Sequence, residues 1–146
     1  MFGMQTEAWL NQDDQFPPGQ RLFRSDRSFA LWAYTVSHSQ LLLRTRTVDE
    51  RSRIDILFKP VDAMKIRAAY DGLAIRCATL EEHDRILAAT GPTGAGLKVL
   101  ILETAGETDY VVTGAVGWKE DHGQDHDPST LAFIPPGSDP GRILPT

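Results

Sequence analysis

The sequence contains a single cysteine, Cys77, among its 146 residues, which excludes a disulfide within the chain. It also lacks long apolar runs, whereas a transmembrane helix needs about 20 consecutive apolar residues. The first residues, 1–19, show no basic segment followed by a long apolar stretch, which is the pattern of a secretory signal. Together these absences predict a cytoplasmic protein that makes no membrane contact.

The motifs that carry nucleotide binding and catalysis in many enzymes are also missing. The glycine-rich stretch 91–96, GPTGAG, fails as a phosphate-binding loop, because such a loop needs lysine directly after its last glycine and Leu97 stands there. No Gly-x-Ser-x-Gly nucleophile elbow occurs, and His38, between two serines, is typical of a turn. We therefore expect no cofactor, and a binding role is favoured over an enzymatic one.

Length and composition predict one folded domain. A chain of 146 residues can bury about 70% of its unfolded surface, which suffices for a core without a metal or a disulfide. Two prolines and a glycine at 17–19 end any regular structure near the start, and both residue types are again frequent at 135–146. The domain is predicted to span 21–127, between a loosely held arm at 1–20 and a Pro/Gly-rich tail at 128–146.

Alternating apolar residues predict that this domain is rich in β-structure. The pattern is clearest at 53–59, where Ile54, Ile56 and Phe58 alternate with a second, more polar set. Residues 30–36 are apolar on both faces, which is typical of a strand near the middle of a fold. The patterns predict about seven strands, at 30–36, 40–45, 53–59, 64–70, 73–78, 97–102 and 109–118.

The dipeptide Asp71-Gly72 lies between two of these alternating segments, which is typical of a tight β-hairpin turn. In that hairpin Tyr70 would pair with Leu73. Arg67 would then face Arg76 across the two strands, and like charges in that position destabilise a sheet unless an anion lies nearby.

One helix is predicted immediately after this segment. Residues 79–82, Thr-Leu-Glu-Glu, form a capping box that starts a helix at Leu80, and Gly91 ends it after about Thr90. The fold class that follows is a β-dominated single domain, an antiparallel sandwich or a partly open barrel, with one short α-helix at about 80–90. The alternative is an α+β fold in which this helix packs on one antiparallel sheet.

Charge is distributed unevenly along the chain, although the net charge of −5 argues against general nucleic-acid binding. Residues 21–76 hold 11 Lys and Arg against 6 Asp and Glu, whereas residues 81–127 hold 3 against 10. If the central strands form one sheet, several arginines would share its polar face. That face would consist of Arg44, Arg46, Arg53, Arg67 and Arg76.

The leading functional hypothesis is a non-enzymatic binding or protein-interaction module that uses this basic face. Its partner would be an anionic protein or ligand, or a second copy of the chain. A second hypothesis is a small metal-dependent hydrolase, because residues 122–127 offer His122, Asp125 and His126 as ligands for a borderline metal. A third is a barrel that carries an apolar small ligand.

Overall fold

The computed structural model describes residues 7–46, 52–91, 94–124 and 126–131. Within these residues the fold consists of nine antiparallel strands in one sheet, one α-helix and two short 3-10 turns, η1 (Asp13–Gln15) and η2 (Ser37–Ser39). The strand order across the sheet is β1-β9-β4-β3-β2-β6-β7-β8-β5. The strands are β1 (Glu7–Leu10), β2 (Arg21–Thr35), β3 (Gln40–Thr45), β4 (Arg53–Phe58), β5 (Val61–Lys65), β6 (Ala69–Cys77), β7 (Lys98–Thr104), β8 (Glu107–Thr113) and β9 (Val116–Asp121).

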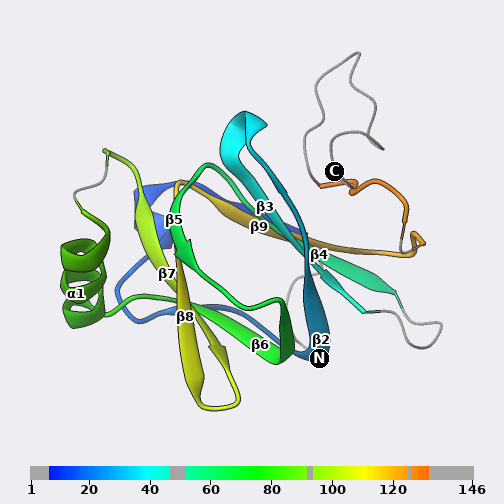
Figure 1. Ribbon diagram of the computed structural model, residues 1–146, viewed down its shortest axis with the longest axis horizontal. Helices are drawn as coiled ribbons and strands as arrows, with labels where there is room; N and C mark the ends of the chain where they lie inside the picture. The colour runs from blue at the N-terminus through cyan, green and yellow to red at the C-terminus, as the bar shows by residue number, and fades with distance from the viewer. Residues whose placement is uncertain (1–6, 47–51, 92–93, 125, 132–146) are drawn as a thin grey trace.

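The sheet curves around one interior, so the expected β-dominated fold with a single short helix is confirmed (Figure 1). Strand β4 pairs with β3 and β9, and after Lys59 and Pro60 the chain continues as β5, which pairs with β8. The Lys59 N–H donates to the Ala115 carbonyl at 3.1 Å, and the Gly114 N–H donates to the Pro60 carbonyl at 3.0 Å. These bonds tie the corner between β4 and β5 to the connection between β8 and β9.

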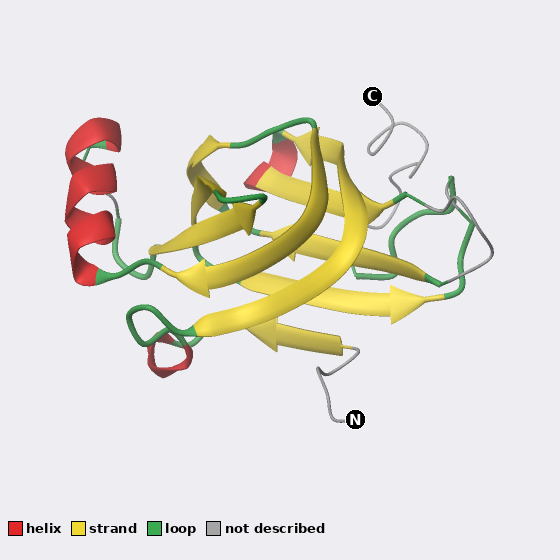
Figure 2. Ribbon diagram, turned by 90° about the horizontal axis from the view of Figure 1, so that it is seen from below, coloured by secondary structure: helices red, strands yellow, loops and turns green. Residues whose placement is uncertain are grey.

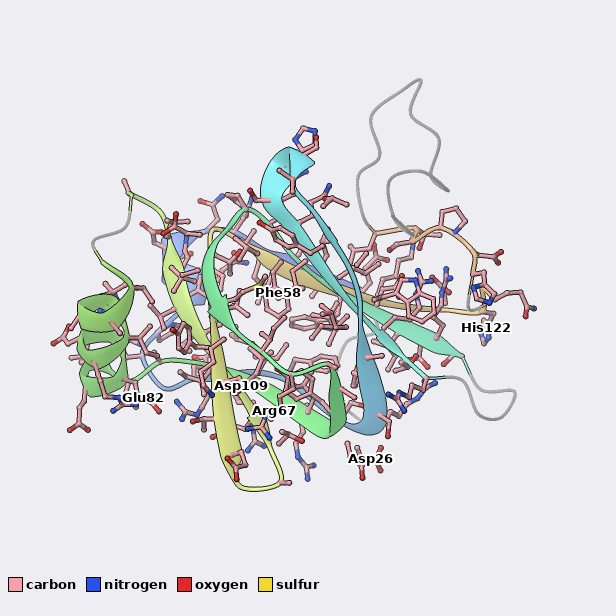
Figure 3. All side chains as sticks on the ribbon, viewed as in Figure 1. Asp26, Phe58, Arg67, Glu82, Asp109 and His122 are labelled. Atoms are coloured by element: carbon pink, nitrogen blue, oxygen red, sulfur yellow. The ribbon has the colours of Figure 1, made fainter. Side chains whose placement is uncertain are left out.

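The interior is filled by buried side chains of β2 to β9, and Ala8 and Leu10 of β1 pack against them. Phe58, labelled in Figure 3, lies in the middle of the barrel and is fully buried, as Ile56 on the same strand is. The core cluster comprises Phe23, Phe29, Leu41, Leu43, Ile56, Phe58, Val61, Tyr70, Leu73, Ile75, Cys77, Leu100, Leu102, Val111, Val116 and Trp118. Inward positions alternate along each strand, as the period of two in the sequence predicts.

Helix α1 (Leu80–Thr90) has the bounds that the sequence predicts and lies outside the barrel wall (Figure 2). The predicted capping box is present, because the Thr79 side chain accepts from the Glu82 N–H at 3.1 Å and the Glu82 carboxylate accepts from the Thr79 N–H at 2.9 Å. Ile86 belongs to a second apolar cluster with Val99 and Val112, on the outer face of β7 and β8. The helix therefore depends on the barrel for its burial.

The predicted hairpin at Asp71-Gly72 is wrong. Strand β6 runs through both residues and pairs with β2 on one side and with β7 on the other. Gly72 has a φ of +83°. The pairing of β2 with β6 shifts register between Ser25 and Ser28, so a β-bulge in β2 lies opposite Gly72. Asp-Gly here marks a bulge instead of a turn, because tertiary pairing on both sides outweighs the local turn preference.

The segments before and after the predicted domain also contribute to the fold. Where the sequence predicts a loosely held arm, β1 pairs with β9, with Trp9 opposite Gly117. A Cβ at Gly117 would lie 2.2 Å from the Trp9 ring, so the pair fits closely. In the predicted tail, Leu131 packs on a third apolar cluster, which contains Leu42 and Leu57. No helix among the described residues is long and apolar enough to cross a membrane.

Candidate binding surface

The arginines that the sequence groups on one basic face lie at separate places in the structure. Arg44 and Arg53 are buried on the outer face of β3 and β4, each with 1% of its side chain exposed. Arg67 and Arg76 each contact a different set of carboxylates near β8 and α1. Arg46 is exposed beyond the end of β3, where its N–H donates to the Ser28 carbonyl at 2.9 Å.

Arg44 forms a buried, two-pronged ion pair with its cross-strand neighbour Asp55. Its Nε and Nη2 donate to the two carboxylate oxygens at 2.7 and 3.1 Å. The guanidinium carbon lies 5.0 Å from the ring centroid of Trp32, within the range of a cation–π contact. Nη1 donates to the Asp127 carbonyl at 3.1 Å. The guanidinium group of Arg44 is therefore bound by groups of the protein itself.

Arg53 binds the chain that follows β9. It donates to the Asp121 carboxylate at 2.9 and 3.2 Å, and to the carbonyls of Gln124, Asp127 and Pro128 at 2.7, 3.0 and 3.3 Å. Burial disfavours the charged form of Asp121, but hydrogen bonds from Arg53 and from the Gly123 N–H outweigh it and lower the pKa of this carboxyl.

These two arginines hold the described residues 121–124 and 126–131, which we call the strap, over the outer face of the barrel. Glycine at position 123 allows this close approach, because a Cβ there would lie 2.5 Å from Nη2 of Arg53. Under the strap lie Trp32, Leu42 and Leu57. Arg44 and Arg53, two of the five arginines that the sequence groups together, thus bind the acidic stretch after β9.

Arg67 belongs to a network around the buried carboxylate of Asp109 (Figure 3). Asp109 accepts from Arg67 Nε at 2.9 Å, from Lys65 Nζ at 3.0 Å and from the Tyr70 hydroxyl at 2.9 Å. Burial raises the pKa of Tyr70 far above its usual value, so the hydroxyl stays protonated and can donate. Burial opposes ionisation of Asp109, but the three donors outweigh it and lower the pKa of its carboxyl.

Arg76 joins helix α1 to the sheet. Its guanidinium donates to both oxygens of Glu82 at 2.6 and 2.7 Å and to Glu103 at 2.9 Å. The hydrogen bond from Arg76 lowers the pKa of Glu82 to about 2. Glu82 therefore caps the helix and anchors it to β6 with the same carboxylate.

Two of the residues proposed as metal ligands, His122 and His126, lie among the described residues. His122 is exposed, whereas the ring of His126 lies 6.3 Å from the Trp32 ring. Asp125 lies outside the described residues. Among the described residues, no group of three or more His, Cys, Asp and Glu side chains could hold a metal ion.

A different feature shows where a partner could bind, because three inward-facing side chains are open to solvent. Leu31 pairs with Leu43, Tyr34 with Leu41, and Met64 with Val111. Directly paired residues share a face of the sheet, and all three partners are completely buried in the core. Nevertheless Leu31, Tyr34 and Met64 are 39%, 38% and 38% exposed.

This exposure arises where the barrel wall divides. The pairing of β2 with β6 ends at Ala30, and the Leu31 N–H donates to the Ala68 carbonyl at 2.8 Å. From that bond β2 continues paired only with β3, while β5 ends the sheet with β8 as its single neighbour among the described strands. We call the ends of β2 and β5 that carry these exposed inward-facing residues, Leu31, Tyr34 and Met64, the split.

The sequence predicts the apolar residues of the split but not their exposure. The apolar residues on both faces of 30–36 predict a doubly buried strand, yet Leu31 and Tyr34 lie where the neighbouring wall is missing. That a strand lacks a neighbour depends on pairing far along the chain, which local periodicity does not contain.

Comparison of the chain with models of known protein families gave no match, and comparisons with curated proteins and with solved structures gave none either. The functional argument therefore depends on the geometry of this molecule.

Proposed function

We propose that the protein is a non-enzymatic interaction module that binds an extended segment of a partner polypeptide in the split. The observation that carries this proposal is the exposure of Leu31, Tyr34 and Met64 on the inward face of the barrel. Inward residues of a closed barrel are buried, so their exposure identifies an unfilled position in the wall.

Backbone groups favour a polypeptide over a compact apolar molecule at this position. Strand β5 is an edge strand, and an edge strand presents a row of N–H and C=O groups to a neighbour. A partner strand of about five residues would match its length and add to the sheet, which is the mode of binding called β-augmentation.

Side chains set which segments fit. Alternate residues of an added strand would point inward onto Leu31, Tyr34 and Met64, so these residues should be apolar. The remaining residues would point outward and can be polar. Asp62 and Lys65 lie on β5 itself and are exposed, and charges on an edge strand limit non-specific pairing. The module would therefore accept an alternating sequence rather than any apolar chain.

The test uses peptides of 12 residues selected from a random display library against the full chain. Selected peptides should alternate between apolar and polar residues. Their affinity should fall at least about tenfold for Tyr34→Glu and for Met64→Glu, because each places a charge in the apolar wall. The matched control is Trp9→Glu, since Trp9 is 41% exposed on the opposite edge strand, β1.

Methylation of alternate peptide N–H groups separates strand addition from simple apolar contact. Methylation at the residues that pair with β5 should abolish binding, whereas methylation at the residues between them should not. If both methylated peptides bind equally well, no strand is added. If Trp9→Glu weakens binding as much as Met64→Glu, the partner lies elsewhere. Self-association through β5 would appear as a concentration-dependent dimer that Met64→Glu dissolves.

A further inference from the structure

A second, separate site lies between helix α1 and the start of β7. It is a pocket of about 320 Å³. The N-terminal segment forms one wall with Asp13, Phe16 and Pro18. The other walls consist of Cys77, Ala78, Leu80, His83, Gly96, Leu97, Lys98 and Val99. The volume lies within the range of small-molecule sites, which begins at about 300 Å³.

One ammonium group lies in this wall, among apolar side chains and the ring of His83. The Lys98 side chain is only 12% exposed. Its Nζ donates to the Gly96 carbonyl at 2.7 Å and lies 5.2 Å from the centre of the Phe16 ring. The carboxylate that neutralises it is Asp13, at 3.0 Å, and this side chain is 88% exposed. The largely buried ammonium group of Lys98 is therefore paired with a carboxylate that is exposed to solvent.

The apolar walls are incomplete in a way that suits an added molecule. Leu80 is 70% exposed although it is the first residue of α1 and lines the pocket, and Phe16 is only partly buried. Cys77 does not supply reactive chemistry, because burial raises the pKa of its thiol to about 11 and keeps it protonated. The pocket thus offers one positive charge, an aromatic face and aliphatic walls.

We propose that this pocket binds a small organic acid, a carboxylate attached to an apolar or aromatic body. The carboxylate pairs with Lys98 Nζ and takes the place of Asp13, whose exposed side chain turns into water. The body of the ligand lies against Phe16, Leu80 and Leu97. An ion pair with an exposed carboxylate contributes little to stability, so a ligand carboxylate can replace Asp13 on Lys98 without a large loss.

The geometry makes Asp13 a competitor of the ligand. Asp13 belongs to η1, which follows β1, and Lys98 is the first residue of β7. A ligand that replaces Asp13 would loosen η1 from β7 while leaving the barrel unchanged. Amide signals of residues 13–16 and 96–99 should therefore respond to binding together.

The experiment titrates the isotope-labelled full chain with phenylacetate, phenylacetamide and phenethylamine, followed by amide NMR. Phenylacetate should shift the signals of the pocket residues, and the neutral amide should bind at least about tenfold more weakly because it lacks the charge. Asp13→Asn should bind phenylacetate more tightly, whereas the neighbouring change Asp14→Asn should leave affinity unchanged. Lys98→Met should lose binding while Lys119→Met should not.

Each outcome decides the proposal. If acid and amide bind equally, Lys98 does not recognise an anion. If no probe shifts the pocket signals at millimolar concentration, or if Asp13→Asn weakens phenylacetate binding, the site is not as described. Thermal unfolding of Lys98→Met is measured in parallel, and because Asp13 is exposed, Asp13→Asn tests competition in a chain whose fold is undisturbed.

Discussion

The outer face under the strap and the split both include residues of β2, but they differ in which side chains are exposed. Under the strap, Arg44 and Arg53 are 1% exposed and their guanidinium groups are bound to carboxylates and carbonyls of the chain. In the split, apolar side chains that should be covered are more than a third exposed. Charged residues are therefore hidden on one face, and apolar residues are open on the other.

This contrast differs from what the sequence predicts, which is an interaction surface made of arginines. Arginine is abundant in the first half of the chain, and a set of arginines favours an anion-binding face. In the folded protein, however, Arg44 is bound mainly by Asp55 and Arg53 by the strap. The residues left exposed are Leu31, Tyr34 and Met64, which are ordinary core residue types. The proposed binding site therefore depends on which residues the fold leaves uncovered.

The largest effect should come from breaking the buried ion pair under the strap. Asp55→Asn would leave the charge of Arg44 buried without its carboxylate, which costs about 3–5 kcal/mol of unfolding free energy. Urea unfolding measures this loss. Asp62→Asn, at an exposed residue of β5, is the matched control and should change stability by less than about 0.5 kcal/mol.

A double variant makes this test specific for the pair. Arg44→Met with Asp55→Leu removes both charges and should recover much of the stability that Asp55→Asn loses. If Asp55→Asn proves as stable as the control, the ion pair does not hold the face closed, and the contrast between the two regions fails.

A smaller loss is expected when a methyl group is inserted between the strap and Arg53. In Gly123→Ala the new Cβ would lie 2.5 Å from Nη2, so the strap must shift, at a cost of about 1–3 kcal/mol. Gly94→Ala is the control, because no atom lies within 4 Å of a Cβ at that position. Thermal unfolding compares the two, and equal midpoints would show that the strap does not touch Arg53.

Acid should weaken the strap before it affects the split. The folded pKa of Asp121 is lower than its unfolded value, which is about 3.9. The stabilisation that this carboxylate provides is therefore complete above that value and is lost as pH falls through the lower folded pKa. The loss should be smaller than for Asp55→Asn, since it involves the single ion pair of Asp121 with Arg53 and Asp121 is partly exposed.

Trp32 reports this transition, because it lies under the strap and contacts Arg44. Its fluorescence, measured in a variant in which phenylalanine replaces Trp9 and Trp118, should change below about pH 4. The same change in Asp121→Asn should already be present at neutral pH. A Trp32 signal that is independent of pH down to the point of global unfolding would contradict the assignment.

The fold could be predicted where a local pattern of residues favours one structure and distant pairing does not oppose it. The capping box from Thr79 to Glu82 fixed the start of α1, and the alternation of Ile54, Ile56 and Phe58 fixed the inward face of β4. Asp71-Gly72 failed because its local preference for a turn competes with pairing to β2 and β7, which the sequence does not display.

The binding surfaces were harder to predict because both depend on contacts between distant segments. The strap covers Arg53 from about 70 positions further along the chain. The split lies where β2 and β5 share no neighbouring strand among those described. The pocket beside α1 was missed for the same reason, since Asp13 and Lys98 are far apart in sequence but 3.0 Å apart in space.

The smallest effect on stability should come from charges placed in the split, and this is the sharpest test of the contrast. Met64→Glu and Tyr34→Glu each put a carboxylate on a side chain that already reaches water, so unfolding free energy should change by less than about 1 kcal/mol. The same change at Leu43, which is completely buried, should unfold the barrel or cost several times more. The two sets of residues point to the same interior, so any difference in cost measures how open the split is. If Met64→Glu destabilises the protein as much as Leu43→Glu, the split is closed in solution, and the proposed strand addition would have no unfilled position in the wall to occupy.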